Sequence, residues 1–168
     1  MFDTVLGLPL HPLIVHVVVV MLPLAALGAL AVVAVPRWNR RYGLFVVAAA
    51  LLGTGSAFVA KQSGEVLASR VGLPAEHYSI ARWLPWVSLV FLVVLAGLWW
   101  IDRPRPGTSD ARVSRRQRRT LTGKAVAVLT VVAALVTLGW TFRAGETGAE
   151  AVWGKIVVNT VPGTNPVP

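Results

Sequence analysis

The charged residues of this chain are gathered into a few short segments, and long uncharged apolar runs separate them. From Thr4 to Pro36 the sequence has 33 residues without Asp, Glu, Lys or Arg. Three similar runs follow, Tyr42–Ala60, Trp83–Ile101 and Ala125–Phe142, with 19, 19 and 18 residues. A helix needs about 20 mainly apolar residues to cross the hydrocarbon core of a bilayer. The pattern therefore predicts four transmembrane helices, at about residues 12–35, 42–60, 83–101 and 125–142.

The segments between and after these runs carry signals for short helices. Ser63 is a candidate N-cap for an amphipathic helix that stops at Gly72, and Pro74 starts a second helical stretch. Near the C-terminus, Thr147 and Glu150 have the spacing of a capping box, which predicts a further helix ending at Gly154. We therefore expect an all-α fold, a four-helix transmembrane bundle with short amphipathic helices on its outer face. It forms one membrane domain over residues 1–168 and has a mobile basic loop at 102–124.

Composition agrees with this fold and excludes several kinds of chemistry. Hydrophobic residues make up 55% of the chain and charged residues 14%, whereas soluble domains have about a quarter charged residues. The absence of cysteine excludes disulfides, thiolate nucleophiles and cysteine-ligated metal sites. The four apolar runs contain no Asp, Glu, Lys or Arg. Proton pumps and ion-coupled transporters normally need such residues within the membrane, so active transport is disfavoured.

The net charge of +9 is distributed in a way that predicts the membrane topology. Segment 36–41 has three basic residues and segment 102–124 has eight, against three in 61–82 and two after residue 142. Under the positive-inside rule the two basic loops are cytoplasmic, and both termini face outward. We expect a multi-pass protein of the bacterial plasma membrane whose basic loop meets the anionic inner leaflet. Nucleic-acid binding is disfavoured, because no aromatic residues interleave with the arginines.

His16 is the most informative candidate for function, because it lies about one and a half turns into the first predicted helix. A neutral imidazole at that depth needs a hydrogen-bond partner or a metal ion. One interpretation is a structural hydrogen bond to another helix, for instance to Ser88. The other is ligation of a metal ion or of haem iron. His11 lies five residues earlier, about 140° around the helix, and is the weaker candidate because the two rings cannot easily share one ion.

A second histidine would be needed for haem, and His77 in the outer loop is the tentative partner. Two histidines on separate helical elements can ligate a haem b between helices. The small residues at 53–56 would allow a flat porphyrin, or another helix, to approach the backbone. Alternatively, a metal ion could use His16 and His77 with Glu65 or Glu146, although its identity stays unknown. No HExxH pattern is present, so a metalloprotease is disfavoured.

Two motifs resemble those of a known family. The run from His11 to His16 reads HPLIVH and resembles the HPxxVH signature of uncharacterised bacterial membrane proteins named domain of unknown function 2231. The stretch at 145–154 is similar to that family's G-x-S/T-G-A-x-x-x-W-G segment. Glu146 stands where relatives often have His or Asp, and Val17-Val18 replaces a Phe-Pro pair. The resemblance covers nearly the whole chain and implies four spans, but it implies no reaction.

Two hypotheses for the function follow from these observations. The first is a non-catalytic integral membrane protein, such as a small subunit of an envelope or respiratory assembly with other membrane subunits. The second is a b-type haem or metal-binding redox protein that uses the outward-facing histidines. Both make an enzyme the less expected outcome. A bound cofactor would distinguish the two hypotheses.

Overall fold

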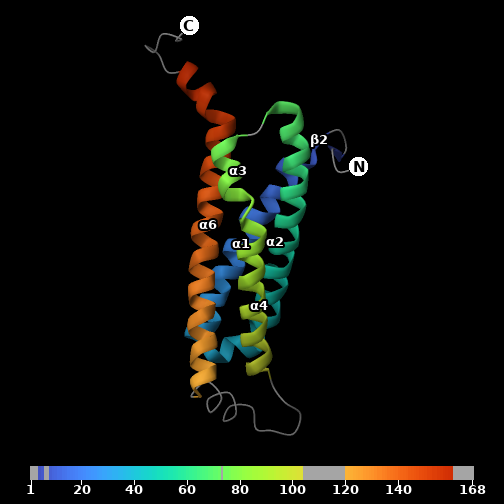
Figure 1. The fold of residues 1–168 in the computed structure, drawn as a ribbon. Helices are drawn as coiled ribbons and strands as arrows, with labels where there is room; N and C mark the ends of the chain where they lie inside the picture. Colours follow the sequence, from blue (N-terminus) through green and yellow to red (C-terminus); the bar gives the residue numbers. More distant parts are fainter. Residues whose placement is uncertain (1–3, 6–7, 73, 104–119, 161–168) are drawn as a thin grey trace.

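Four long helices run side by side in the computed structural model of this protein (Figure 1). The structure describes residues 4–5, 8–72, 74–103 and 120–160. Within this part, four helical segments are long and apolar enough to cross a membrane. The predicted four-helix transmembrane bundle is therefore confirmed. Its helices are α1 (Leu10–Ala34), α2 (Pro36–Val71), α4 (Leu84–Asp102) and α6 (Leu121–Thr160), with a short helix α3 (Ala75–Ala81) before α4.

Each long helix packs against two others, so the bundle closes in the order α1, α2, α4, α6. Two short strands, β1 (Thr4–Val5) and β2 (Leu8–Pro9), pair in antiparallel fashion before α1. They lie at the same end of the bundle as α3 and the last turns of α6 (Figure 1). At the opposite end only Val35 separates α1 from α2. Pro36 can begin α2 there because its missing N–H would have no helical partner.

Small residues on the inward side of α2 leave space for larger residues of the neighbouring helices. The inward positions of α2 recur in alternating steps of four and three residues, the spacing of a left-handed bundle. They are Asn39, Gly43, Val46, Ala50, Gly53, Ala57, Ala60 and Gly64, all buried or half-buried. On α4 the same steps give the buried residues Leu84, Ser88, Phe91, Leu95, Leu98 and Asp102. Small side chains on one helix thus let the backbone of the next approach closely.

Gly53 shows this packing most directly. A Cβ atom added there would lie 2.7 Å from a terminal carbon of Leu22 on α1. Beside it, the buried Thr54 hydroxyl donates a hydrogen bond to the carbonyl of Ser88 on α4, at 3.3 Å. Gly53 and Thr54 of the small patch at 53–56 are therefore contacts between helices. Leu22 fills the space over Gly53, so a porphyrin cannot lie against that residue in this packing.

The expected helix start at Ser63 is wrong, because α2 continues unbroken to Val71. Ser63 is buried within α2, and its hydroxyl donates to the carbonyl of Ala60 at 3.2 Å. Continuing an existing helix adds one backbone hydrogen bond per residue, whereas starting a new helix requires a costly nucleus. The predicted stop is confirmed at Gly72, whose φ of 92° is a conformation that favours glycine.

The expected capping box at Thr147 is also wrong. Helix α6 passes through Thr147 and Gly154 and ends at Thr160. The Thr147 hydroxyl instead donates back to the carbonyl of Arg143, four residues earlier, at 2.9 Å. This bond is available only to a threonine that already lies inside a helix. Most of the basic loop expected at 102–124 lies outside the described residues.

A buried polar contact joins α2 to α4 at the end opposite the histidines His11 and His77. The amide of Asn39, which is fully buried, donates to a carboxylate oxygen of Asp102 at 2.9 Å. Asp102 is the last residue of α4 and is itself buried. Both residues belong to charged segments of the sequence, where a position at the membrane surface is the ordinary expectation. Only the packing of α2 on α4 removes them from solvent.

Candidate functional site

His11 lies in the first turn of α1 and is held by α2. Its Nδ1 atom is 2.9 Å from the carbonyl oxygen of Ala60 and 3.4 Å from the hydroxyl of Ser63. A carbonyl oxygen can only accept, so this bond places the ring proton on Nδ1. The Nε2 atom then carries a lone pair and points to the other side of the ring. In this tautomer Nε2 is the ring nitrogen that can accept a hydrogen bond or act as a ligand.

Gly64 provides the surface against which the His11 ring lies. A Cβ atom added at Gly64 would be 2.9 Å from Cε1 and 3.0 Å from Nδ1 of His11. Real Cβ atoms essentially never come that close, so an alanine here would displace the imidazole. The dipeptide Ser63–Gly64 therefore positions His11 in two ways. The Ser63 hydroxyl lies near Nδ1 of the ring, and Gly64 has no side chain that would displace the ring.

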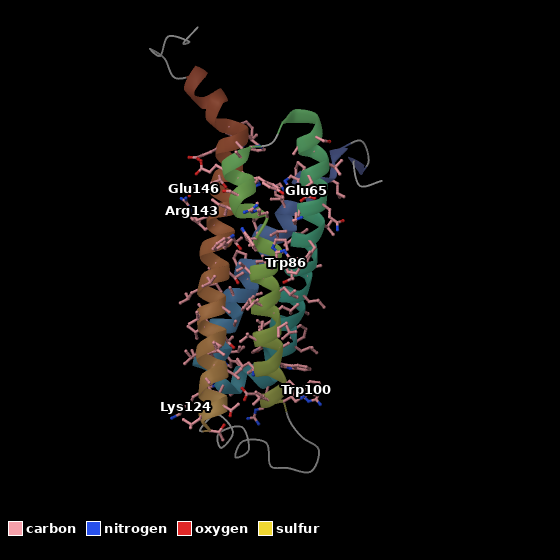
Figure 2. All side chains as sticks on the ribbon, in the orientation of Figure 1. Glu65, Trp86, Trp100, Lys124, Arg143 and Glu146 are labelled. Atoms are coloured by element: carbon pink, nitrogen blue, oxygen red, sulfur yellow. The ribbon has the colours of Figure 1, made fainter. Side chains whose placement is uncertain are left out.

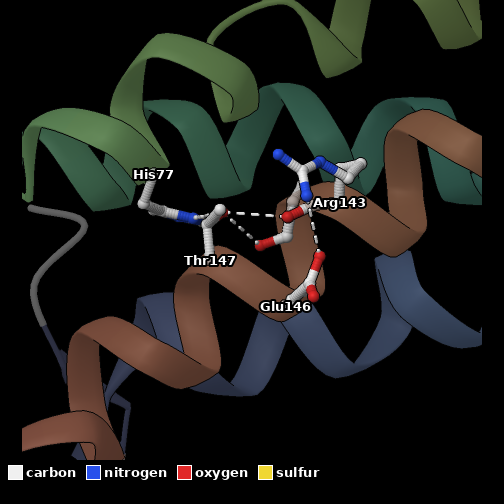
Figure 3. Close-up of polar contacts among 5 residues, drawn as sticks. His77, Arg143, Glu146 and Thr147 are labelled. Atoms are coloured by element: carbon white, nitrogen blue, oxygen red, sulfur yellow. Dashed lines mark hydrogen bonds and ion pairs between the residues drawn. The ribbon is translucent and has the colours of Figure 1, made fainter.

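His77 is held in the same manner, by α6. Its Nδ1 atom is 3.2 Å from the hydroxyl oxygen of Thr147, as Figure 3 shows. The single hydroxyl proton of Thr147 is directed to its own helix, toward the carbonyl of Arg143. The oxygen of Thr147 thus accepts from Nδ1–H of His77. The Nε2 atom of His77 is again the nitrogen with the lone pair.

Gly148 lies against the ring of His77, as Gly64 lies against the ring of His11. A Cβ atom added at Gly148 would be 3.2 Å from Cε1 of His77 and 3.4 Å from its Nδ1. A hydroxyl residue followed by glycine thus supports each ring, once on α2 and once on α6. The hydrogen bonds of these two rings with Ala60, Ser63 and Thr147 are all made through Nδ1, and His77 is also hydrogen-bonded to the backbone of Ala144. The two imidazoles are also near enough for their charges to interact.

We call His11 and His77 the imidazole pair, and the end of the bundle where they lie the imidazole end. Trp140 fixes the short helix that carries His77. Its indole Nε1 donates to the carbonyl of Ile80 in α3 at 2.9 Å. Below the pair, an apolar layer separates it from the rest of the bundle, and it includes Val18, Leu22, Ala57, Ala60, Leu84 and Ala144.

The two glutamates considered as metal ligands are engaged elsewhere. Glu65 pairs with Lys61 at 2.7 Å, and Glu146 pairs with Arg143 at 3.1 Å, in both cases along one helix face. Figure 2 shows Glu65, Arg143 and Glu146 at the imidazole end, and Figure 3 shows the Arg143–Glu146 contact. Among the described residues, no group of three or more His, Asp or Glu side chains could hold a metal ion. A zinc site of histidines and a glutamate is thus not assembled there.

His16, the first candidate from the sequence, is exposed on the outside of the bundle. Its Nδ1 atom is 2.6 Å from the carbonyl of Pro12 in its own helix. The expected hydrogen bond to Ser88 is wrong, because the Ser88 hydroxyl donates to the carbonyl of Pro85 instead. The structure thus brings His77 together with His11, the weaker sequence candidate, and turns His16 to the surface.

The sequence does contain a pattern that places His11 on the buried side of α1. The buried residues Val18, Leu22, Ala25, Ala29 and Val32 of α1 follow steps of four and three. Continued toward the N-terminus, the same steps reach Val15 and then His11, and they pass over His16. The signal cannot be read before the buried side of α1 is known, because this helix is apolar on every side.

Comparison with known proteins identifies one family to which this chain is related. Neither a curated protein nor a solved structure matches this chain. A family described as Predicted membrane protein (DUF2231) matches residues 7–161. That range contains all of α1 to α6, with both histidines of the imidazole pair and both dipeptides that support them. The match confirms the resemblance seen in the two sequence motifs, and the chain belongs to this family of predicted membrane proteins.

Proposed function

We propose that this protein binds one b-type haem, with His11 and His77 as axial ligands of the iron. The observation that carries the proposal is the imidazole pair, two rings from different helices whose Nδ1 atoms are both bonded to the protein. A ligating histidine almost always donates its other ring N–H to a carbonyl, carboxylate or similar acceptor. Ala60 and Thr147 supply these acceptors. Such partners fix the tautomer and make the ligating nitrogen more basic.

The number of histidines favours haem over a bare metal ion. Zinc sites use three or four protein ligands, and the described residues offer no such group. A haem brings four equatorial nitrogens of its own, so two imidazoles complete the coordination of its iron. With both imidazoles holding its iron, the haem would supply one-electron transfer and would not bind a substrate. This supports electron transfer, as in a small subunit of an envelope or respiratory assembly, over catalysis.

The absorption spectrum of purified protein tests this proposal. Protein produced in cells supplied with haem precursors should show a Soret band, with sharp visible bands after reduction by dithionite. Electron paramagnetic resonance of the oxidised form should show low-spin iron, as two strong axial ligands require. Colourless protein without bound metal would contradict the proposal. The two histidines would then have a structural role, in which their hydrogen bonds join α1 to α2 and α3 to α6.

We further propose that both chain termini face the outside of a bacterial plasma membrane, with the imidazole end outward. The unequal number of basic residues on the two sides supports this orientation. At the end opposite the pair, exposed basic residues include Arg37, Arg41 and Lys124. Lys124 and the exposed Trp100 both lie at this end in Figure 2. Anionic lipids of the inner leaflet would attract these side chains.

Cysteine labelling tests the orientation. We expect a cysteine at Ser69 to react with a membrane-impermeant maleimide on intact cells, and a cysteine at Ser109 to react only after the cells are opened. Ser69 is exposed near the end of α2, and Ser109 belongs to the segment with eight basic residues. The chain has no natural cysteine that would interfere. Labelling at Ser109 but not at Ser69 on intact cells would contradict the proposed topology.

A further inference from the structure

The charged side chains at the two ends of the bundle have different partners. At the imidazole end, Lys61 and Arg143 each form an ion pair with a glutamate about one turn away. At the opposite end the described residues include one carboxylate, that of Asp102, which is buried and accepts from Asn39. The basic residues at this end form no ion pair within the described part of the chain, and they are Arg37, Arg40, Arg41, Arg103 and Lys124. Their charge can be balanced by an anion from outside the chain.

Arg40 and Arg103 lie at the same junction between two helices. The hydrogen bond from Asn39 to Asp102 joins α2 to α4 at this junction. Arg40 follows Asn39 in α2, and Arg103 follows Asp102 at the end of α4. Nearby, a Cβ atom added at Gly43 would lie 2.7 Å from an indole carbon of α4, which shows how closely the two helices approach. The packing thus brings two arginines to one level of the bundle from segments that are far apart in the sequence.

The guanidinium group of Arg103 is oriented by the aromatic ring beside it. Its central carbon lies 3.4 Å from the ring centroid of Trp100. A guanidinium group directs its five N–H donors outward in its own plane, so stacking on an indole leaves these donors able to bind another group. Arginine binds phosphate through two parallel N–H bonds, which are stronger than bonds between neutral groups. Trp100 is itself exposed, as is typical of a tryptophan at the headgroup level.

We propose that one anionic phospholipid binds at this junction, with its phosphate group between Arg40 and Arg103. Its acyl chains lie beside α2, where the exposed Leu44 is about one turn deeper in the membrane than Arg40. Lipid headgroups are the anions present at the end of a transmembrane helix. An anionic lipid suits the site better than phosphatidylcholine, because both arginines repel the choline cation. The site is independent of the haem, and only its assignment to the inner leaflet rests on the proposed function.

Native mass spectrometry of the full-length protein tests this site. The protein is released from detergent micelles that contain equal amounts of phosphatidylglycerol and phosphatidylcholine, and the ratio of the two singly bound lipids is measured. One basic residue contributes about a five-fold preference for anionic lipid. We expect Arg40→Gln and Arg103→Gln each to lower the ratio by about that factor. Arg103→Lys should lower the ratio as well, because lysine keeps the charge but has no planar set of donors.

Arg82→Gln is the control variant. Arg82 also stacks on a tryptophan, with its guanidinium carbon 5.3 Å from the ring centroid of Trp83, but it lies at the imidazole end. We expect this variant to keep the wild-type ratio. Thermal unfolding of each variant shows whether its bundle has formed.

Four results would overturn the inference. They are an unchanged ratio in both glutamine variants of the junction, a wild-type ratio in Arg103→Lys, an equal decrease in Arg82→Gln, and adducts of inorganic phosphate in place of lipid. The second and third would show that binding follows charge alone, and the fourth would give the two arginines to a soluble anion. The proposed function fails separately. Colourless protein, or cysteine labelling that reverses the topology, would leave the lipid site in place and contradict only the haem or the orientation.

Discussion

Replacing His11 or His77 by alanine is expected to abolish the Soret absorbance of the haem-loaded protein, whereas His16→Ala should retain it. Each ring of the imidazole pair supplies one of only two protein ligands, so either substitution removes half of the iron's attachment to the protein. His16 is exposed and bonded to its own helix. It is therefore a matched control, with the same substitution in the same helix as His11. The measurement is haem per chain after purification, from absorbance and total protein.

The residues that hold the two rings should show a smaller effect. Thr147→Val removes the acceptor of the Nδ1 proton of His77, and losses of this type typically weaken metal affinity by about 10- to 100-fold. We expect haem that is present but dissociates more readily, measured by transfer to apomyoglobin. Equal haem loss from His16→Ala and His11→Ala would contradict the assignment of ligands. Thermal unfolding of each variant shows whether its bundle has formed.

Gly53→Ala is expected to destabilise the bundle by roughly 1–3 kcal/mol, the usual cost of overpacking a well-packed core. The added methyl group would lie 2.7 Å from a side-chain carbon and 3.1 Å from the backbone nitrogen of Leu22. The side chain can rotate away, but the backbone nitrogen cannot move unless α1 moves away from α2. The measurement is the free energy of unfolding in mixed micelles, from a titration with denaturing detergent.

Gly55→Ala is the control for this prediction. Gly55 lies two residues later in the same helix, and an added Cβ would find nothing within 4 Å. Because alanine has the higher helix propensity, by up to about 1 kcal/mol, we expect unchanged or slightly increased stability. Equal losses of stability in the two variants would show that the contact of Gly53 with Leu22 does not limit the packing of α1 on α2.

The number and approximate position of the membrane helices could be predicted from the sequence, because the cost of placing charge in hydrocarbon is large. Each of the four uncharged runs contains a helix long enough to cross a membrane. Their ends were predicted less well. Ser63 and Thr147 have the residue types of helix N-caps, yet each lies within a long helix and supports a histidine. A residue of the N-cap type starts a helix only where the preceding residues are not helical. Whether they are helical depends on how the neighbouring helices pack.

The sequence by itself determined that His11, His16 and His77 lie toward the same end of the bundle, because span order and helix length fix the level of each residue. Only the tertiary structure decided which two of them meet. In a soluble protein the polar face of a helix would reveal its inward side. In a membrane both lipid and core are apolar, so α1 carries no such contrast. Its inward side is set by the small residues of α2, which turn His11 toward Gly64 and leave His16 facing lipid.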